Sequence, residues 1–369
     1  MKISRKKGLD IWFLSTVLTI TLGGFLIFLS ASTGMLPKEN INYPGVIISQ
    51  SVALILGLTL LFLFSHIHYR FWRKHALVIL IAVFILSLLV FIPGLGLTHG
   101  GATRWLSVGP FNLQPAVFLQ LGFIIYCSAW LSGIASKIHR FSFGLLPMII
   151  ILSVIALILL LQRDTGSLVI IASVGFAMFF VAGAKWRDIF ILSTLGLSGL
   201  AFLASQRLYI RERFMTTFSR VLTDTQGADY QINQSLIAIG SGEWFGRGFG
   251  QSVQKFVFLP EAPTDSIFAV AAEELGFIGA LFIIALFLML TWRGMQIAIK
   301  APDNFARLLV VGIVIMFITQ AFIHIGGMVN IFPLSGTPLS FISLGGTSLM
   351  ISLASAGIIL NVSRYTKIK

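Results

Sequence analysis

About ten apolar runs, each near the length of a membrane-spanning helix, constrain the fold of this chain more than any other feature. A helix of about 20 residues crosses the roughly 30 Å hydrocarbon core of a bilayer, and a chain in lipid must pair its own backbone polar groups. Only 11% of the residues are charged, whereas soluble domains carry roughly 25%. We therefore predict an all-α polytopic membrane protein with about ten transmembrane helices. The expected spans are residues 10–32, 45–65, 76–94, 114–133, 143–162, 167–183, 188–205, 266–292, 308–328 and 346–362.

The basic residues predict how these spans are oriented, because cytoplasmic connections carry an excess of Lys and Arg. With the N-terminus placed inside, most of the 26 Lys and Arg residues fall on the cytoplasmic side. They lie in segments 2–7, 70–74, 137–140, 185–187, 293–307 and 364–369. We predict that both termini are cytoplasmic and that 206–264 is a long extracytoplasmic loop between the seventh and eighth helices. The clusters lie between apolar runs, so the net charge of +13 indicates membrane topology and no nucleic-acid partner.

Two other outer segments are more than connectors. Residues 95–113 contain the sequence GGATRWLSVGPFN. Residues 329–346 are too apolar for a solvated loop and too rich in Gly and Pro for a continuous helix. Irregular backbone at membrane depth is tolerated only where protein covers it, so we predict a re-entrant or broken segment there. The whole chain, 1–369, is expected to form a single membrane domain.

Asp265 is the strongest candidate for chemistry, because it lies at the mouth of a predicted span and carboxylates near lipid are costly. Such a carboxylate could act as a general base. Another interpretation is a helix N-cap at Thr264 or Asp265, since Ser, Thr and Asp favour that position. The two roles are compatible. Glu273 and Glu274 lie deeper in the same span and could pair with an arginine, line a polar channel or make structural contacts.

Three basic residues of the outer segments are candidates for binding an anion. Arg104, in the Gly-flanked segment beside Trp105, could hold a diphosphate through bidentate hydrogen bonds. Arg247 and Lys255 in the long loop are further candidates. Taken individually, each of the three is more often a headgroup-facing or surface charge. Asp164 is expected in a tight outer turn, as a surface partner of Arg163 or as an N-cap. His324 is a lone histidine, which argues against a metal site.

Four blocks in order, across most of the chain, resemble the SEDS family (shape, elongation, division and sporulation) of bacterial cell-wall polymerases, the FtsW/RodA group. They are GATRWLSVGPFNLQP at 101–115, LQRDTGS at 161–167, SGEWFGRGFGQSVQKFVFLPEAPTDSIFAVAAEELGFIG at 241–279 and FPLSGTPLSFISLGGTSLM at 332–350. The wording of the third block is closer to the FtsW division branch than to RodA.

The resemblance implies ten membrane helices in the bacterial cytoplasmic (inner) membrane, with the active face outside. It implies a peptidoglycan glycosyltransferase that polymerises lipid II in cell division or cell-wall growth. Asp265, in the family's Thr-Asp motif, would deprotonate the acceptor 4-hydroxyl for an inverting transfer, and Arg104 and Lys255 would stabilise the departing diphosphate. The other substrate-binding residues expected from these blocks are Arg247, Glu273, Gln114, Asp164 and Ser343.

The resemblance also predicts partners: lipid II, undecaprenyl-linked glycan, a class B penicillin-binding transpeptidase and other divisome or elongasome membrane proteins. No cofactor is assigned, and a divalent cation is left open. Val117 and Gln120 stand where the family usually has Glu and Lys, Pro263 replaces a His, and Arg163 replaces a Pro. The missing Glu and Lys leave a non-catalytic scaffold that activates a transpeptidase open as a second function. The intramembrane carboxylates and the broken segment would equally suit a lipid II flippase or other transporter.

Overall fold

The computed structural model describes residues 8–35, 43–99, 102–108, 111–206, 228–256 and 258–366. The basic residues predicted at 2–7, together with Lys367 and Lys369, lie outside the described residues, as does 207–227 of the long outer loop. Within the described part, the long helices are α1 (Ile11–Ser32), α2 (Tyr43–His66), α3 (Arg70–Leu88), α4 (Pro115–Gly133), α5 (Leu145–Leu161), α6 (Thr165–Val181), α7 (Trp186–Gln206), α9 (Ala228–Ser241), α10 (Ile267–Ile299), α11 (Asn304–Met328) and α12 (Gly346–Ser363). Short 3-10 turns follow α1 at Thr33–Met35 and α3 at Leu89–Phe91.

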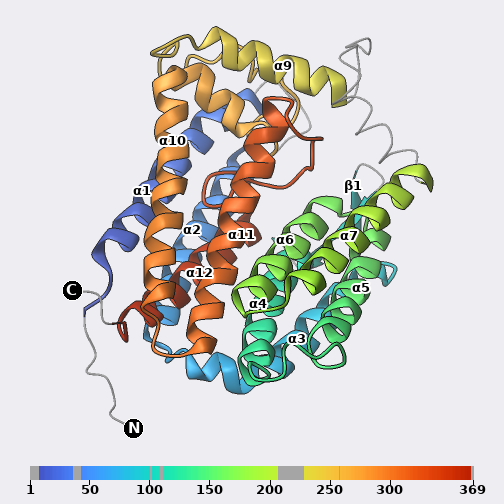
Figure 1. Ribbon diagram of the computed structural model, residues 1–369. Helices are drawn as coiled ribbons and strands as arrows, with labels where there is room; N and C mark the ends of the chain where they lie inside the picture. Colours follow the sequence, from blue (N-terminus) through green and yellow to red (C-terminus); the bar gives the residue numbers. More distant parts are fainter. Residues whose placement is uncertain are drawn as a thin grey trace.

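Each predicted apolar run overlaps one long helix (Figure 1). Among the described residues, seven helices are long and apolar enough to cross a membrane, and α5 and α6 are shorter apolar helices of 17 residues each. The prediction of a helical polytopic membrane protein is confirmed. The number of ten spans stays a prediction.

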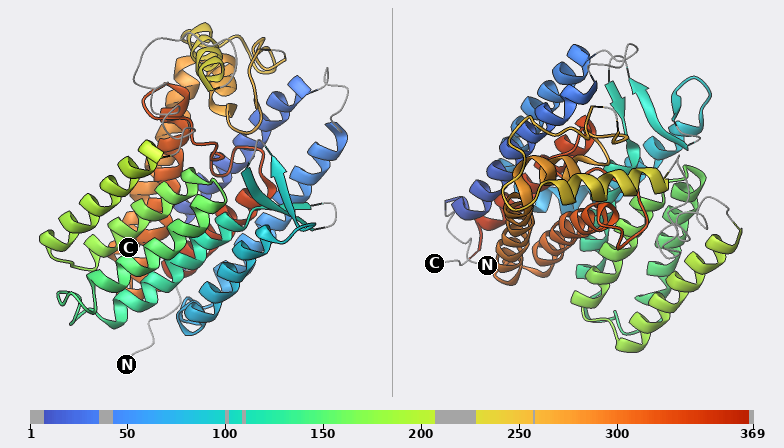
Figure 2. Two further views of the ribbon diagram at one scale, coloured as in Figure 1. Left: turned by 90° about the vertical axis from the view of Figure 1, so that its right-hand side faces the viewer. Right: turned by 90° about the horizontal axis from the view of Figure 1, so that it is seen from above.

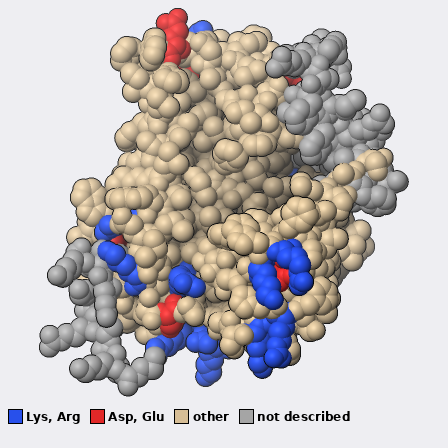
Figure 3. Space-filling model, in the orientation of Figure 1, with Lys and Arg blue, Asp and Glu red and all other residues tan. Residues whose placement is uncertain are grey.

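The buried helix α12 lies at the centre of the bundle, and α2, α11 and α4 pack around it. Helix α11 also contacts α10 on one side and α6 on the other, so it joins the two halves of the bundle seen in Figure 1. The start of α1 and the end of α12 lie together, because the backbone N–H of Asp10 donates to Ser363 Oγ at 3.2 Å. In Figure 3, Lys and Arg side chains gather towards that end, away from α9.

Residues 95–113 form a small antiparallel sheet that the sequence analysis did not anticipate. Its strands are β1 (Gly96–His99), β2 (Ala102–Val108) and β3 (Phe111–Leu113), in the order β1-β2-β3. Gly96 pairs with Leu106, and Leu106 also pairs with Leu113. The sheet stands beside the helices in Figure 2 and carries Arg104 on its central strand.

Helix α10 is broken at Gly276, whose φ of 70° and ψ of −172° are not helical. A side chain at Gly276 would collide with the backbone of Phe245 and Gly246, which lie directly against the break. The loop supplies the missing backbone partners: Phe277 N–H donates to Glu243 O at 2.8 Å, and Gly248 N–H donates to Glu274 O at 3.1 Å. Residues 267–275 therefore form a separate half-helix, with a tip near Asp265 and a base at the break.

Residues 329–346 form an irregular segment, as predicted, in which most residues are buried or half-buried. Its backbone is paired by neighbouring protein rather than by lipid. Gln320 Nε2 donates to Pro338 O at 2.8 Å, and Leu344 N–H donates to Pro263 O at 2.8 Å. The second bond attaches the segment to the turn that carries Asp265.

Candidate active site

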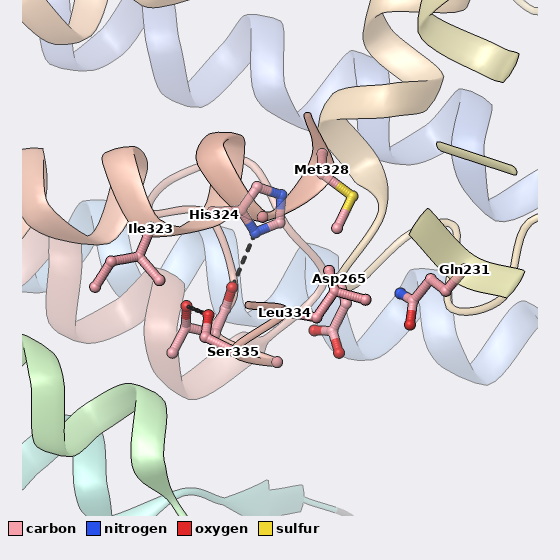
Figure 4. Close-up of a pocket in the computed structure, with 10 residues that line it drawn as sticks. Gln231, Asp265, Ile323, His324, Met328, Leu334 and Ser335 are labelled. Atoms are coloured by element: carbon pink, nitrogen blue, oxygen red, sulfur yellow. Dashed lines mark hydrogen bonds between the residues drawn. The ribbon is translucent and has the colours of Figure 1, made fainter. Parts of the chain in front are cut away.

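A cavity of about 230 Å³ lies where α9, the turn before α10, the end of α11 and the segment 334–337 meet (Figure 4). Its walls combine apolar and polar side chains from elements far apart in the sequence. The lining residues are Gln231, Asp265, Ile323, His324, Gly327, Met328, Leu334, Ser335, Gly336 and Thr337.

Asp265 lies one residue before the N-cap of α10, which is Ser266. The interpretation of Thr264 or Asp265 as the N-cap is therefore wrong. Two bonds of Ser266 hold the chain here: its N–H donates to Glu261 O at 3.1 Å and its hydroxyl donates to Pro260 O at 2.9 Å. Gln231 from α9 donates to the same hydroxyl at 2.9 Å. This turn places the Asp265 carboxylate on the cavity wall.

Arg104 and Asp265 flank a single glycine. A Cβ built on Gly336 would lie 3.5 Å from Asp265 Oδ2 and 3.8 Å from Arg104 Nη1. Gly336 has a φ of +64°, a conformation that side-chain-bearing residues rarely adopt. A glycine thus allows the backbone of segment 334–337 to pass between the carboxylate and the guanidinium.

One hydrogen bond to a backbone carbonyl orients the guanidinium of Arg104. Its Nη2 donates to the carbonyl of Arg163. Its Nε is buried and has no hydrogen-bond partner among the described residues. An arginine fixed at one nitrogen, with another donor unpaired, is suited to an anionic ligand such as a diphosphate.

Asp164 and Gln114 support this arrangement from behind. Asp164 is only 2% exposed and caps α6, accepting from Ser167 N–H at 3.0 Å and from Ser167 Oγ at 2.9 Å. The N-cap interpretation is confirmed, and a surface pair with Arg163 is wrong because the carboxylate is buried. Gln114 Nε2 donates to Asp164 Oδ2 at 3.5 Å.

Arg163, which stands where the family usually has Pro, adopts a backbone conformation that proline cannot. Arg163 has a φ of +57°, whereas proline is fixed near −65°. The carbonyl that accepts from Arg104 is therefore presented by a backbone conformation that proline could not adopt.

Ser343 holds the turn before α10 and is not part of the cavity lining. Its hydroxyl donates to Thr264 O at 2.9 Å and accepts from Leu339 N–H at 2.8 Å. Since Thr264 precedes Asp265, this bond fixes the position of the carboxylate relative to the broken segment. The predicted contact of Ser343 with substrate becomes a positioning role in this geometry.

Glu273 and Arg247 meet at the base of the half-helix, away from the cavity lining. Glu273 is fully buried and accepts from Ser252 Oγ and from Val253 N–H, the latter at 3.0 Å. Arg247 Nε lies 3.6 Å from Glu273 Oε1. Of the interpretations offered for Glu273, pairing with an arginine and structural polar contacts are both confirmed.

Lys255 corrects a prediction. Its side chain is buried, and its ammonium donates to Glu274 Oε1 at 2.8 Å, Gly250 O at 2.8 Å and Ser30 Oγ at 3.0 Å. An ammonium has three donors, and all three are used. The described residues use all three donors of Lys255, so the side chain as placed here has no donor left for a diphosphate. It joins the loop and α1 to the base of the half-helix.

His324 is the residue that sequence reasoning missed, because only a metal role was considered for it. The ring is 3% exposed and lines the cavity with Asp265, and Nδ1 lies 2.9 Å from Thr337 O (Figure 4). Within the described part of the chain, no group of three or more His, Cys, Asp or Glu side chains could hold a metal ion. The segment Ser335-Gly336-Thr337, which was predicted to be broken but not assigned to the site, forms the opposite wall.

The fold and this site define a multi-pass membrane protein with a polar cavity beside a broken segment. The model of the FtsW/RodA/SpoVE family, described as "Cell cycle protein", matches residues 10–368, and the chain belongs to this family.

Curated relatives agree with this assignment. The chain is 36% identical to the probable peptidoglycan glycosyltransferase FtsW of Geobacter sp. (strain M18), over 97% of this chain and 98% of the relative. It is 39% identical to the stage V sporulation protein E of Bacillus subtilis (strain 168), over 85% of each chain. These relatives confirm the predicted resemblance, and the FtsW relatives confirm the enzyme class, glycosyltransferase.

Solved structures show the same fold. A chain from a peptidoglycan synthase complex that coordinates polymerization and crosslinking superposes with a TM-score of 0.77 and 26% identity, covering 96% of this chain and 98% of that one. The rod shape determining protein RodA of Thermus thermophilus gives a TM-score of 0.70 and 27% identity, covering 98% of each chain.

Proposed function

We propose that this chain polymerises lipid II into glycan strands and that Asp265 is the general base. The observation that carries the proposal is the placement of Asp265 on a cavity wall, across Gly336 from the guanidinium of Arg104. A proton acceptor and an anion-binding group on either side of one glycine suit a transfer in which a hydroxyl attacks and a diphosphate departs.

In the proposed reaction Asp265 removes the proton from the 4-hydroxyl of the acceptor GlcNAc. The oxygen attacks the anomeric carbon of the donor MurNAc from the face opposite the diphosphate. The bond from that carbon to the phosphate oxygen breaks, and undecaprenyl diphosphate leaves with the bonding electron pair. The positive charge of the Arg104 guanidinium stabilises the charge that develops on the leaving group.

The remaining predicted residues take supporting roles in this proposal. Asp164 and Gln114 fix the end of α6 next to Arg163, whose carbonyl orients Arg104. Ser343 fixes the turn at Thr264. Glu273, Arg247 and Lys255 anchor the base of the half-helix whose tip carries Asp265.

We further propose that the cavity faces outward from the bacterial cytoplasmic membrane and that a class B transpeptidase is the partner. The basic connections at the end away from α9 support this orientation. The similarity to a chain of a complex that coordinates polymerization and crosslinking supports a crosslinking partner.

The test is polymer formation from lipid II by the purified chain with its transpeptidase, comparing wild type with Asp265→Ala. Glycan strands made by wild type and lost in Asp265→Ala are the expected result. Movement of labelled lipid II between leaflets of liposomes without polymer would support a flippase instead. Stimulation of the transpeptidase without polymer would support a scaffold, for which Val117 and Gln120, both buried in α4, are the motive.

A further inference from the structure

Gln50 is a buried amide in a largely apolar helix, outside the residues that form the candidate site. It lies in α2 and is 2% exposed. Burying an amide costs free energy unless its donor and its acceptor are paired. Both are paired here: Nε2 donates to Ser343 O at 3.3 Å, and Oε1 accepts from Gly345 N–H at 3.3 Å. One side chain thus bonds the backbone on both sides of Leu344.

The same short segment, 343–345, holds the turn that carries Asp265. The hydroxyl of Ser343 donates to the backbone carbonyl of Thr264 at 2.9 Å. The backbone N–H of the next residue, Leu344, donates to the carbonyl before Thr264 at 2.8 Å. The segment is therefore bonded to α2 on one side and to the turn before the carboxylate on the other.

Helix α2 gives this amide a firm support, because it packs closely along α12. A Cβ built on Gly57 would lie 2.6 Å from Leu353 Cδ1, and one built on Gly357 would collide with the Leu61 carbonyl. Small residues at helix interfaces let backbones approach closely in membranes. Segment 343–345 leads directly into α12, so the amide connects one helix of a close pair to the start of the other.

Two interpretations account for the bonds of Gln50. Irregular backbone at membrane depth must find partners within protein, and Gln50 supplies two of them. That purpose alone requires no connection to the site, yet only segment 343–345 separates the amide from the turn before Asp265. Displacing a reacting group by about 1 Å can slow an enzyme roughly 100-fold. The position of this segment therefore matters for the proposed chemistry.

We propose that Gln50 is a positioning residue for Asp265: it fixes segment 343–345 from α2, and that segment fixes the turn that carries the carboxylate. This inference rests on the proposed function. Because Gln50 is not among the residues that line the cavity, its effect is on the chemical step and not on binding of the substrate.

The chain offers a matched control at the other end of the α2–α12 pair. Asn361 in α12 is also a buried amide that bonds two backbone groups: Nδ2 donates to Ser65 O at 2.9 Å, and Oδ1 accepts from Tyr69 N–H at 2.9 Å. Gln50→Met and Asn361→Leu each keep the approximate size of the side chain and remove its hydrogen bonds. Gln50→Asn is a milder second variant, because a shorter amide loses reach for bonds that already measure 3.3 Å.

The measurement is polymerisation rate against lipid II concentration, expressed per folded protein, together with thermal unfolding in detergent. Gln50→Met and Asn361→Leu should both lower the melting temperature, because each leaves two buried backbone groups unpaired. Only Gln50→Met should also lower the maximal rate, by about 10- to 100-fold. Its half-saturating lipid II concentration should stay within about threefold of wild type, since the lost interaction acts on the chemical step. Gln50→Asn should lower the maximal rate by about threefold or more.

Equal maximal rates for Gln50→Met and Asn361→Leu would show that the amide supports folding alone and would overturn the inference. If Gln50→Met does not fold, the same comparison is made with Gln50→Asn. A higher half-saturating concentration without a loss of maximal rate would also overturn it. If wild type makes polymer and the two variants match, only the role of Gln50 fails. If wild type makes no polymer, the proposed function fails and this inference fails with it.

Discussion

The two ends of one short half-helix, 267–275, treat their polar groups in opposite ways. At the base, Glu274 accepts from Lys255 at 2.8 Å and from Ser30 at 2.6 Å, and Glu273 accepts from Ser252. At the tip, Arg104 Nε and His324 Nε2 are buried without partners among the described residues. A completed hydrogen-bond network in a low-dielectric interior fixes structure, whereas a buried polar group without a partner destabilises it and calls for an explanation. The comparison separates carboxylates that look alike in the sequence.

The largest effect on activity is expected at the tip. Asp265→Asn preserves the shape of the side chain but cannot accept the proton, so the polymerisation rate should fall about 10²- to 10⁴-fold. Melting temperature should change little. The control is Glu243→Gln, an exposed carboxylate of the same outer loop, which should retain wild-type rate. Polymer formation by Asp265→Asn at more than a tenth of the wild-type rate would remove Asp265 as the base.

At the base, the largest effect is expected on stability. Lys255→Met leaves Glu274 buried without its cation, which costs about 3–5 kcal/mol. The double change Lys255→Met with Glu274→Leu removes both charges and should recover most of that loss. Thermal unfolding in detergent measures both.

Activity of the double variant distinguishes the two roles of Lys255. A stable double variant with near-normal polymerisation would agree with an anchoring role. A stable but inactive double variant would indicate that Lys255 binds the substrate.

A smaller loss is expected at the break between the two halves of α10. Gly276→Ala places a side chain at a φ of +70° and against the backbone of the loop, and such strained positions cost about 1–3 kcal/mol. Gly199→Ala is the matched control, because Gly199 lies in α7 with open space around its Cβ position. It should be neutral or stabilising by up to about 1 kcal/mol. Equal melting temperatures for the two variants would show that the break does not depend on Gly276.

The smallest effect is expected for a substitution that keeps the positive charge of Arg104 but removes its planar guanidinium. Arg104→Lys retains a cation but loses the planar fork, so we expect a rate loss of about 10-fold, or roughly 1.4 kcal/mol. Arg247→Lys, in which the cation pairs with Glu273 outside the cavity lining, should change the rate less than threefold. A loss for Arg247→Lys as large as that for Arg104→Lys would contradict the division between base and tip.

Most of the helices followed from the sequence because length and hydropathy act locally. Each apolar run overlaps a helix, and the Gly- and Pro-rich segment 329–346 is irregular as predicted. The sheet at 96–113 was not predicted, because short strands depend on partners and carry weak local signals. The break at Gly276 was missed for a related reason, since the loop at 243–248 supplies the missing backbone partners.

The candidate site divides in the same way. The sequence alone made Asp265 a candidate, because a carboxylate at the mouth of a membrane span is costly and therefore conspicuous. It made Arg104 a candidate because a guanidinium in a Gly-flanked outer segment could hold a diphosphate. It could not separate Lys255 from Arg104, since both are basic residues of outer segments. Only the tertiary structure showed that the ammonium of Lys255 donates its hydrogen bonds to Glu274 and Ser30. It also showed that His324 and Asp265 line the same cavity. The physical reason is that the free-energy cost of burying a side chain depends on its type, which the sequence gives. Its role depends on which partners the fold brings within hydrogen-bonding distance.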